Sequence, residues 1–413
     1  MRHKIRKEKN GAYFFNCETG MVKFLPEDIF QSVKNVINCR IIYPKIPLEK
    51  LPDACFSAPS KVYIELTRKC NLRCRTCYNK AGNALDEELS RKKIFSILDE
   101  LARAGTFEIR FTGGEPTQRK DFFEIVSYAH KLGFFISVGT NGVWNQDILE
   151  RISKSTINMV IISIEGPEYI NDSIRGKGAF KKAARSLAYL ANHTNKILRI
   201  NMTLAKYNIN YMDFVVKLAD KYRIPVINTM PIRLNGRSAE FLKSQILTPK
   251  DYLKFIKHIE KLRKTCKVNI QTYFDILGER SRWLENQTSL INKQTCAAGV
   301  EACVISPAGD IYGCAASNPD DPKLSRNIRE MLIAGNVKEK SVMDIWLDSS
   351  RWKIYRNLKL NKSKKCLECN FYKKKCFGNC FVSSFFASGR LNAADPYCFA
   401  HLLKHKEAGK NVR

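Results

Sequence analysis

Three cysteines stand close together directly after the first predicted strand, in the run Cys70-Asn-Leu-Arg-Cys74-Arg-Thr-Cys77. Three thiolates at this spacing can bind three irons of a [4Fe–4S] cluster and leave the fourth iron open for another ligand. A structural zinc site would need a fourth ligand nearby, yet no Cys or His occurs between Cys77 and His130. The spacing therefore favours a cluster with one open iron over a structural zinc site.

A second set of cysteines occupies the last third of the chain, where turn residues are frequent and apolar periodicity is weak. Its members are Cys296, Cys303, Cys314, Cys366, Cys369, Cys376, Cys380 and Cys398. A segment of this kind is one that metal binding would fold. On spacing alone, the four cysteines from 366 to 380 could also form a zinc ribbon, so two kinds of metal site stay open at this point.

The elements that must position the first cysteine loop alternate between strand-like and helix-like runs. The expected strands are 61–67, 108–112, 134–139, 158–164, 198–204 and 225–232, and the expected helices are 91–104, 121–132, 147–154, 180–191 and 211–222. A further helix at about 249–265 has Thr248 as its N-cap. Such alternation predicts an α/β fold with a parallel sheet. Six units are too few for a closed eight-stranded barrel, so we expect an open, partial (β/α)6 TIM-like barrel.

The flanking regions differ from this pattern. Residues 11–15 and 21–25 alternate like a hairpin, and a short helical run follows from Pro26. We therefore expect five parts: an N-terminal hairpin element (1–55), the barrel core (56–245), a helical bridging segment (246–295), a Cys-rich iron–sulfur domain (296–400) and a basic tail (401–413).

The first cysteine loop resembles the hallmark CxxxCxxC loop of the radical SAM enzymes, which bind S-adenosylmethionine (SAM) at the open iron. Further matching runs are Gly113-Gly114-Glu115-Pro116, Thr140-Asn141-Gly142, Ser163-Ile-Glu165-Gly166 and Arg175-Gly-Lys-Gly178. Each of them follows a predicted strand, at the end where parallel barrels gather their active sites. The resemblance implies one [4Fe–4S] cluster on Cys70, Cys74 and Cys77.

The same resemblance implies contacts to SAM. Gly113, Gly114 and Glu115 would line its amino group, Ser163 and Glu165 its ribose, and Arg175 its carboxylate, with Asn141 as a further contact. Two positions depart from the family pattern. Glu165 replaces the usual Asp, and Thr76 stands before the third cysteine, where an aromatic residue or His often touches adenine.

The C-terminal cysteines resemble the SPASM domain, which carries auxiliary [4Fe–4S] clusters beyond the SAM-binding one. The one departure from its seven-cysteine pattern is an extra residue between Cys369 and Cys376. By this resemblance Cys296, Cys314 and Cys380 hold the first auxiliary cluster, and Cys366, Cys369, Cys376 and Cys398 hold the second. Cys303 is the candidate eighth ligand. The alternative interpretation is that Cys303 is a small, buried apolar side chain on a strand.

Enzymes with this domain mostly modify peptides. We therefore expect SAM to be cleaved reductively to a 5′-deoxyadenosyl radical that takes hydrogen from a ribosomally made precursor peptide, giving a crosslink, an epimer or a related oxidation. The expected partners are that peptide and an external electron donor of the flavodoxin or ferredoxin type. Ala315, after Cys314, argues against formylglycine formation. Synthesis of a cofactor or small molecule is the alternative, and no residue is assigned as a catalytic acid or base.

Composition sets the outer limits. The 413 residues include 70 Lys plus Arg against 40 Asp plus Glu, a net charge of +30, and 15 cysteines. No apolar run is long enough to span a membrane, and no signal core follows the basic N-terminus, so a cytoplasmic location is expected. The charge is best explained by solvated faces. An iron–sulfur protein that binds nucleic acid is the less favoured class, because no aromatic–basic stacking module is present.

Overall fold

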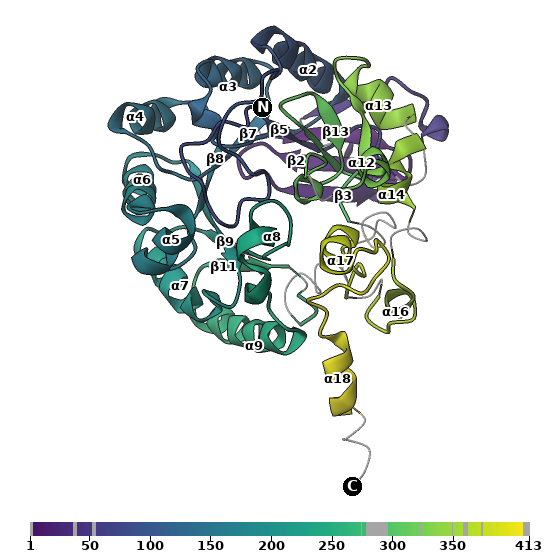
Figure 1. Cartoon of the computed structure of the whole chain (residues 1–413). Helices are drawn as coiled ribbons and strands as arrows, with labels where there is room; N and C mark the ends of the chain where they lie inside the picture. Colours follow the sequence, from purple (N-terminus) through teal and green to yellow (C-terminus); the bar gives the residue numbers. More distant parts are fainter. Residues whose placement is uncertain are drawn as a thin grey trace.

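The computed structural model describes residues 3–35, 39–51, 55–273, 275–277, 296–321, 324–348, 350–357, 362–372 and 375–407. Residues 274 and 278–295 of the expected bridging segment and residues 408–413 of the expected tail lie outside these ranges. The main feature is a ten-stranded sheet in the order β11-β10-β9-β8-β7-β6-β5-β12-β13-β14. Figure 1 shows the helices arranged around the outside of this curved sheet.

The predicted partial barrel is confirmed, and its strands pair in parallel in chain order. They are β5 (Lys61–Glu65), β6 (Glu108–Thr112), β7 (Phe135–Thr140), β8 (Met159–Ser163), β9 (Ile197–Leu204) and β10 (Val226–Pro231). The covering helices are α2 (Arg91–Ala104), α3 (Phe122–Lys131), α4 (Gln146–Lys154), α5 (Glu168–Arg175), α6 (Ala179–His193) and α7 (Met212–Lys221). Local signals set their ends: Ser90 caps α2 by accepting from the amide of Lys93, and Gly105 ends it with φ at 82°.

The sheet extends further than predicted beyond β10. Helix α9 (Pro249–Thr265) begins with the capping box formed by Thr248 and Asp251. It leads into β11 (Asn269–Thr272), which pairs in parallel with β10. The bridging segment therefore contributes a strand as well as a helix. The four residues of β11 are polar at every second position. An alternation of this length cannot be distinguished from a loop.

The Cys-rich region also joins the sheet. Strand β12 (Ala302–Ile305) pairs in parallel with β5 at the other end of the barrel. It continues as an antiparallel extension through β13 (Asp310–Tyr312) and β14 (Ile333–Asn336). The cysteine-bearing loops are thus tied by backbone hydrogen bonds to the first barrel strand.

The core lies between the sheet and the outer helices. Ile109 and Phe111 of β6 and Ile97 and Leu101 of α2 are at most 2% exposed. Burying each such side chain stabilises the fold by about 1.5–3 kcal/mol. This packing makes the sheet a rigid support for the loops that follow the strands.

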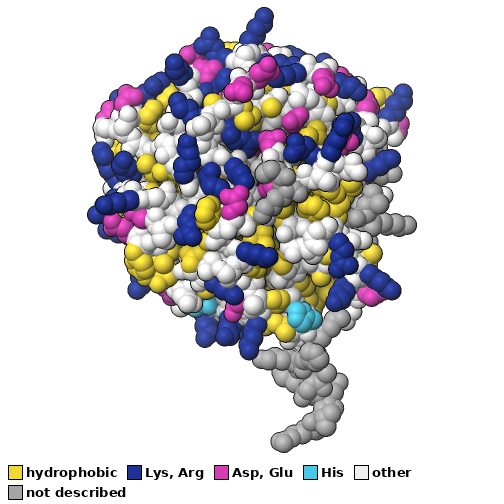
Figure 2. All heavy atoms as spheres, in the orientation of Figure 1, with side chains coloured by type: hydrophobic (Ala, Val, Ile, Leu, Met, Phe, Trp, Pro, Cys, Tyr) yellow, Lys and Arg dark blue, Asp and Glu magenta, His cyan; other side chains and the backbone are white. Residues whose placement is uncertain are grey.

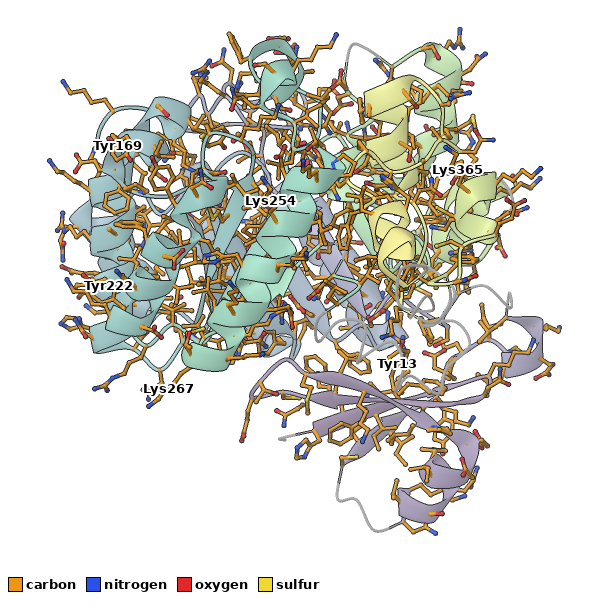
Figure 3. The ribbon with its side chains drawn as sticks, turned by 90° about the horizontal axis from the view of Figure 1, so that it is seen from below. Tyr13, Tyr169, Tyr222, Lys254, Lys267 and Lys365 are labelled. Carbon is orange, nitrogen blue, oxygen red and sulfur yellow. The ribbon has the colours of Figure 1, made fainter. Side chains whose placement is uncertain are left out.

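A second, four-stranded sheet is formed by the N-terminal segment, in the order β3-β2-β1-β4. Its elements are β1 (His3–Glu8), β2 (Gly11–Asn16), β3 (Val22–Pro26) and β4 (Arg40–Ile42), with helix α1 (Glu27–Val33) between β3 and β4. The expected hairpin is β2–β3. Figure 3 shows this sheet projecting from the barrel, with Tyr13 on the face turned toward it.

This N-terminal sheet packs against the start of the barrel strands. Phe15 stacks on Phe107 at 5.0 Å, and Tyr13 meets Phe56 edge-on at 4.4 Å. The buried side chain of Arg6 donates to Glu8 at 2.7 Å and to the carbonyl of Gly105 at 3.0 Å. The sheet therefore lies at the opposite end of the barrel from the loops that follow its strands.

The remaining elements cover the C-terminal side. They are α8 (Ser238–Phe241), α12 (Arg326–Leu332), α13 (Val342–Asp348), α14 (Lys353–Arg356), α16 (Lys364–Leu367), α17 (Phe381–Ser388) and α18 (Ala400–Glu407). None of the described helices is both long and apolar enough to cross a membrane. Figure 2 shows Lys and Arg scattered over the visible face, with no single basic patch.

Candidate functional site

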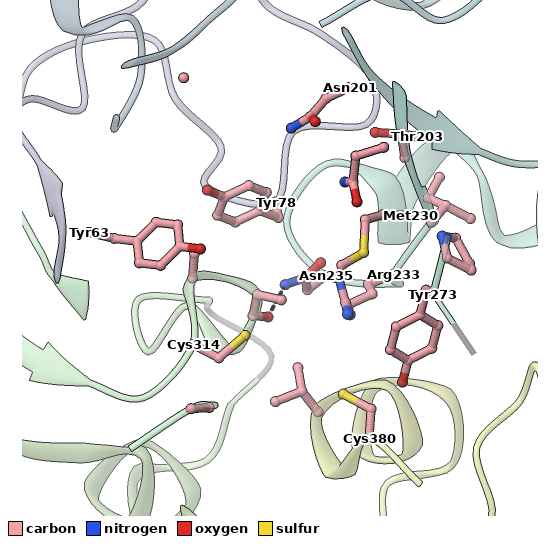
Figure 4. A pocket seen from close by; sticks show the side chains of 18 of the residues that line it. Tyr63, Tyr78, Asn201, Thr203, Met230, Arg233, Asn235, Tyr273, Cys314 and Cys380 are labelled. Atoms are coloured by element: carbon pink, nitrogen blue, oxygen red, sulfur yellow. Dashed lines mark hydrogen bonds between the residues drawn. The ribbon is translucent and has the colours of Figure 1, made fainter. Parts of the chain in front are cut away.

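A cavity of about 690 Å³ opens where the barrel strands end. Cys70, Cys74 and Cys77 line one side of it, and the C-terminal cysteines Cys314 and Cys380 line the other. Its size is that of pockets that hold small organic ligands. Side chains from the barrel interior form its floor, as the close view in Figure 4 shows. The cavity therefore brings both predicted sets of cysteines to one space.

The first cysteine loop is held by hydrogen bonds to its own backbone. The amide of Leu72 donates to Cys70 Sγ at 3.4 Å, and the amide of Ala81 donates to Cys77 Sγ at 3.3 Å. Arg237 Nε donates to the carbonyl of Cys74 at 2.8 Å. Amides directed at sulfur favour the thiolate, which is the form that binds metal.

The paired glycines lie against this loop. A Cβ on Gly114 would stand 2.2 Å from the carbonyl oxygen of Lys69, and one on Gly113 would stand 2.4 Å from that of Thr67. Gly113 also has φ at +134°, where other residues are strained. Both glycines line the cavity. Their role here is to let the backbone after β6 approach the cysteine loop closely.

Glu115 lies beneath the cavity and does not line it. Its carboxylate accepts from the hydroxyls of Thr117 at 2.8 Å and Thr140 at 2.9 Å, and from the amide of Asn141 at 2.9 Å. Burial raises its pKa, and these hydrogen bonds oppose that rise. In this arrangement Glu115 orders the loop after β7, which carries Asn141 into the cavity wall with its Nδ2 at 3.8 Å from Cys70 Sγ.

Glu165 is likewise fully buried and supports another residue. It accepts from Arg175 Nη2 at 2.6 Å and from the amide of Thr203 at 2.8 Å. Arg175 lines the cavity, and its Nη1 lies 4.0 Å from Cys74 Sγ. Ser163 at the end of β8 lines the cavity as well. Burial alone would lower the pKa of Arg175, but Glu165 reverses this and raises it. Glu165 thus keeps a charged guanidinium beside the cysteine loop.

The cavity wall holds polar atoms with unused hydrogen-bonding capacity. Arg175 Nε, Asn201 Oδ1 and Asn235 Oδ1 are buried without a hydrogen-bond partner among the described residues. Buried polar atoms are normally satisfied, so these three are suited to a polar ligand. Thiolates, a guanidinium and amides on one wall fit an iron–sulfur cluster with a ligand that carries amino, carboxylate and hydroxyl groups. The residues present therefore fit SAM.

The barrel floor is charged and internally paired. Glu108 accepts from Lys61 at 2.7 Å and from Arg110 at 3.0 Å, and its side chain is 5% exposed. Burial would raise its pKa, but the charges of Lys61 and Arg110 outweigh burial and lower the pKa to about 2. Arg110 lines the cavity from below.

The C-terminal cysteines lie in two groups. Cys314 interacts electrostatically with Cys296 and Cys380. Cys376 interacts with Cys366 and Cys398, and Cys398 also interacts with Cys369. A zinc ribbon would keep Cys380 with Cys366, Cys369 and Cys376. Cys380 instead interacts with Cys314, although Cys376 and Cys380 both line the cavity. No three His, Cys, Asp or Glu side chains of the described ranges converge as the ligands of one metal ion.

Cys303 is not brought together with either group. It lies on β12 and is fully buried in the hydrophobic core. Its neighbours Ala302 and Val304 line the cavity, so the alternation of the strand directs Cys303 to the other face. Burial raises the pKa of its thiol to about 12.

Sequence reasoning missed the segment 233–237, which follows β10. Arg237 bonds to the first cysteine loop, and Asn235 Nδ2 donates to the carbonyl of Ala316 at 2.6 Å beside Cys314. A Cβ on Gly236 would stand 2.4 Å from the carbonyl oxygen of Cys77. The available signal was the run Arg-Leu-Asn-Gly-Arg at the end of a barrel strand.

Comparison with known proteins agrees with this geometry. Residues 64–219 match the radical SAM superfamily model, and residues 296–370 match the SPASM iron–sulfur cluster-binding domain. The chain is 30% identical to mycofactocin maturase MftC of Mycobacterium ulcerans over 358 residues, covering 83% of this chain and 88% of that protein. The chain belongs to the radical SAM superfamily. As a radical SAM/SPASM enzyme it uses SAM and iron–sulfur clusters.

Other relatives of this radical SAM enzyme differ in what their names state. It is 27% identical over 350 residues to the AdoMet-dependent heme synthase of Oleidesulfovibrio alaskensis, covering 81% of this chain and 85% of that protein. Among solved structures, Streptococcus suis SuiB bound to its precursor peptide SuiA has the same fold, with a TM-score of 0.73 and 18% identity over 96% of this chain and 98% of that one.

Proposed function

We propose that this radical SAM/SPASM enzyme modifies a ribosomally synthesised precursor peptide by abstracting a hydrogen atom from one of its residues. The observation that carries the proposal is the 30% identity to a mycofactocin maturase along 83% of the chain. A second support is the continuous cavity between the two sets of cysteines. The product would be a crosslink, an epimer or a related oxidation, with an external flavodoxin- or ferredoxin-type donor supplying electrons.

The proposed SAM-binding centre uses Cys70, Cys74 and Cys77 as cluster ligands. When bound, SAM and the reduced cluster supply a 5′-deoxyadenosyl radical that can take hydrogen from an unactivated C–H bond. Arg175 would pair with the SAM carboxylate while Glu165 holds the guanidinium in place. The wall formed by Gly113, Gly114, Asn141 and Ser163 orients the ligand, and the buried Glu115 fixes the loop of Asn141.

The proposed auxiliary centres are two, giving three [4Fe–4S] clusters in all. Cys296, Cys314 and Cys380 bind the first, and Cys366, Cys369, Cys376 and Cys398 bind the second. We leave Cys303 out of the ligands because it lies in the core on the far face of β12. The first cluster would then have one position free of protein thiolate.

Residues 1–55 are proposed to bind the precursor peptide. Strand β3 is the edge of the N-terminal sheet, and an edge strand can accept an added peptide strand. Met21 and Ile29 beside this edge are 55% and 44% exposed. Residues 56–245 would then act as the SAM-binding core and 296–400 as the auxiliary-cluster domain.

The test of the proposal is anaerobic incubation with a co-encoded short peptide, SAM and reductant, followed by mass spectrometry. A mass change in the peptide is expected. A double variant, Met21→Asp with Ile29→Asp, should lower peptide affinity, whereas Tyr43→Asp, 62% exposed beyond the opposite edge strand, should not. Formation of 5′-deoxyadenosine without any change in a peptide of the locus would refute the proposal.

A second candidate is the synthesis of a cofactor or another small molecule. It is favoured by the 27% identity to an AdoMet-dependent heme synthase. On this alternative the Met21→Asp and Ile29→Asp changes leave turnover intact, and no short open reading frame accompanies the gene.

A further inference from the structure

The strongest unassigned feature of the cavity is Arg233, two residues after β10 ends. Its Nε donates to Ser383 Oγ at 3.2 Å. The amide of Ser383 in turn donates to Cys380 Sγ at 3.5 Å, because Cys380 is the N-cap of α17. One serine therefore connects a guanidinium of the barrel to a sulfur of the first auxiliary group.

The charge of Arg233 is directed at the cysteines. Figure 4 shows Arg233 near Tyr273, with Cys314 and Cys380 below it on two different segments. Burial alone would lower the pKa of Arg233, but the charges of Cys380 and Cys314 reverse this and raise it. Its guanidinium also lies 5.5 Å from the centre of the Tyr273 ring.

Two other arginines that line the cavity have a carboxylate partner: Arg110 pairs with Glu108 at 3.0 Å, and Arg175 pairs with Glu165 at 2.6 Å. Arg237, also in the cavity wall, donates to the backbone carbonyls of Cys74 and Ala81. Arg233 has no ion pair of this kind within the described parts of the chain. The nearby carboxylate of Asp395 accepts from the Tyr273 hydroxyl at 2.9 Å and from the amide of Cys380 at 3.1 Å. Asp395 supplies part of the negative charge that acts on Arg233, and a cluster bound by Cys314 and Cys380 would add to it.

We propose that Arg233 is a positioning residue that raises the reduction potential of the first auxiliary cluster and orients Cys380 through Ser383. With three thiolates the oxidised cluster carries about −1, and uptake of one electron from an external reductant makes it about −2. Arg233 stays protonated throughout. A fixed positive charge stabilises the more negative reduced form, so the cluster becomes a better acceptor for an electron leaving the substrate.

This inference rests on the proposed assignment of Cys314 and Cys380 as ligands. The test is a potentiometric titration followed by electron paramagnetic resonance. It uses the full-length reconstituted protein with Cys70, Cys74 and Cys77 changed to Ala, which removes the signal of the SAM-binding cluster. Three variants are compared: Arg233→Gln, Arg233→Lys, and Arg110→Gln as a matched loss of charge from the cavity floor.

At the midpoint potential of the parent protein, Arg233→Gln should lower the reduced-to-oxidised ratio of one auxiliary signal by about tenfold or more. Tenfold corresponds to about 59 mV for a one-electron couple. Arg233→Lys keeps the charge and should stay within about threefold. Arg110→Gln should leave the ratio unchanged. Iron content and circular dichroism identify any variant that fails to fold, and Ser383→Ala then supplies a milder perturbation in the same direction.

An unchanged potential in Arg233→Gln would overturn the role of Arg233. If Arg233→Gln in the enzyme that keeps Cys70, Cys74 and Cys77 also shows a raised KM for the substrate, Arg233 is instead a contact for a substrate anion. The ligand assignment is tested separately: if the signal survives substitution of both Cys314 and Cys380, that assignment fails, whatever Arg233→Gln does.

Discussion

The support of Arg175 by Glu165 can be tested with a single substitution. Glu165→Gln keeps the shape of the side chain but replaces one accepting oxygen with a donor. The two oxygens of Glu165 accept from Arg175 Nη2 at 2.6 Å and from the amide of Thr203 at 2.8 Å. One of these donors must then face another donor. Breaking a buried ion pair from one side costs about 3–5 kcal/mol.

Part of that cost should appear as weaker SAM binding, because Arg175 then lacks the partner that directs it into the cavity. If one third to one half is expressed in binding, the SAM Kd rises about 5- to 60-fold, at about 1.4 kcal/mol per tenfold. The assay is anaerobic equilibrium dialysis with reconstituted enzyme of matched iron content.

The control is Glu168→Gln on α5. Glu168 forms an exposed ion pair with Lys181 at 3.2 Å, and such surface pairs contribute little. Its SAM Kd should stay within about twofold. Equal SAM affinity in Glu165→Gln and the parent enzyme would refute the positioning role of Glu165. Glu165→Asp introduces the residue usual in the family. Its SAM Kd should lie between those of the parent enzyme and Glu165→Gln, because the shorter side chain loses one of the two contacts.

Three further outcomes are expected. Gly114→Ala should abolish loading of the SAM-binding cluster, because the new Cβ would stand 2.2 Å from a backbone oxygen. The control Gly139→Ala, whose new Cβ would have its nearest neighbour at 3.5 Å, should load this cluster normally. Equal cluster loading in the two variants would contradict the close-approach argument. Cys314→Ala should lower iron by about four per chain, and Cys303→Ala should not; a loss in both would restore Cys303 as a ligand. The pKa of Glu108 is about 2 in the folded protein, against 4.5 for an unperturbed glutamate. Its carboxylate therefore contributes about 3 kcal/mol that is fully present above pH 4.5 and is lost as the pH falls toward 2. Urea unfolding of Glu108→Gln should therefore show a flatter pH dependence in that window than the parent protein, and parallel curves would contradict the ion pairs of the barrel floor.

The barrel could be predicted from sequence because its strands and helices carry strong local signals. Alternating apolar runs such as those of β6 and α2, and the capping box of Thr248, need no tertiary information. Strands β11 and β12 could not be predicted this way. Each has four residues, and each becomes a strand because a neighbouring barrel strand offers it free hydrogen-bonding groups.

Some features of the candidate site could likewise be predicted from sequence, and others could not. Cysteine spacing is a local signal, and it located the residues that meet at the cavity. The direction of a side chain depends on packing, which spacing does not contain. Glu115 and Glu165 therefore lie beneath the cavity wall instead of in it, and Cys303 faces the core. Arg233 lies in a run whose spacing indicates no partner, and only the approach of α17 to the end of β10 brings it to Ser383 and through it to Cys380.

The central claim is that a radical formed in this cavity takes hydrogen from a peptide. The most direct measurement is isotope transfer from a perdeuterated precursor peptide, incubated anaerobically with enzyme, SAM and reductant. We predict that deuterium appears in 5′-deoxyadenosine in proportion to the modified peptide. Modified peptide accompanied by 5′-deoxyadenosine without deuterium would contradict the account.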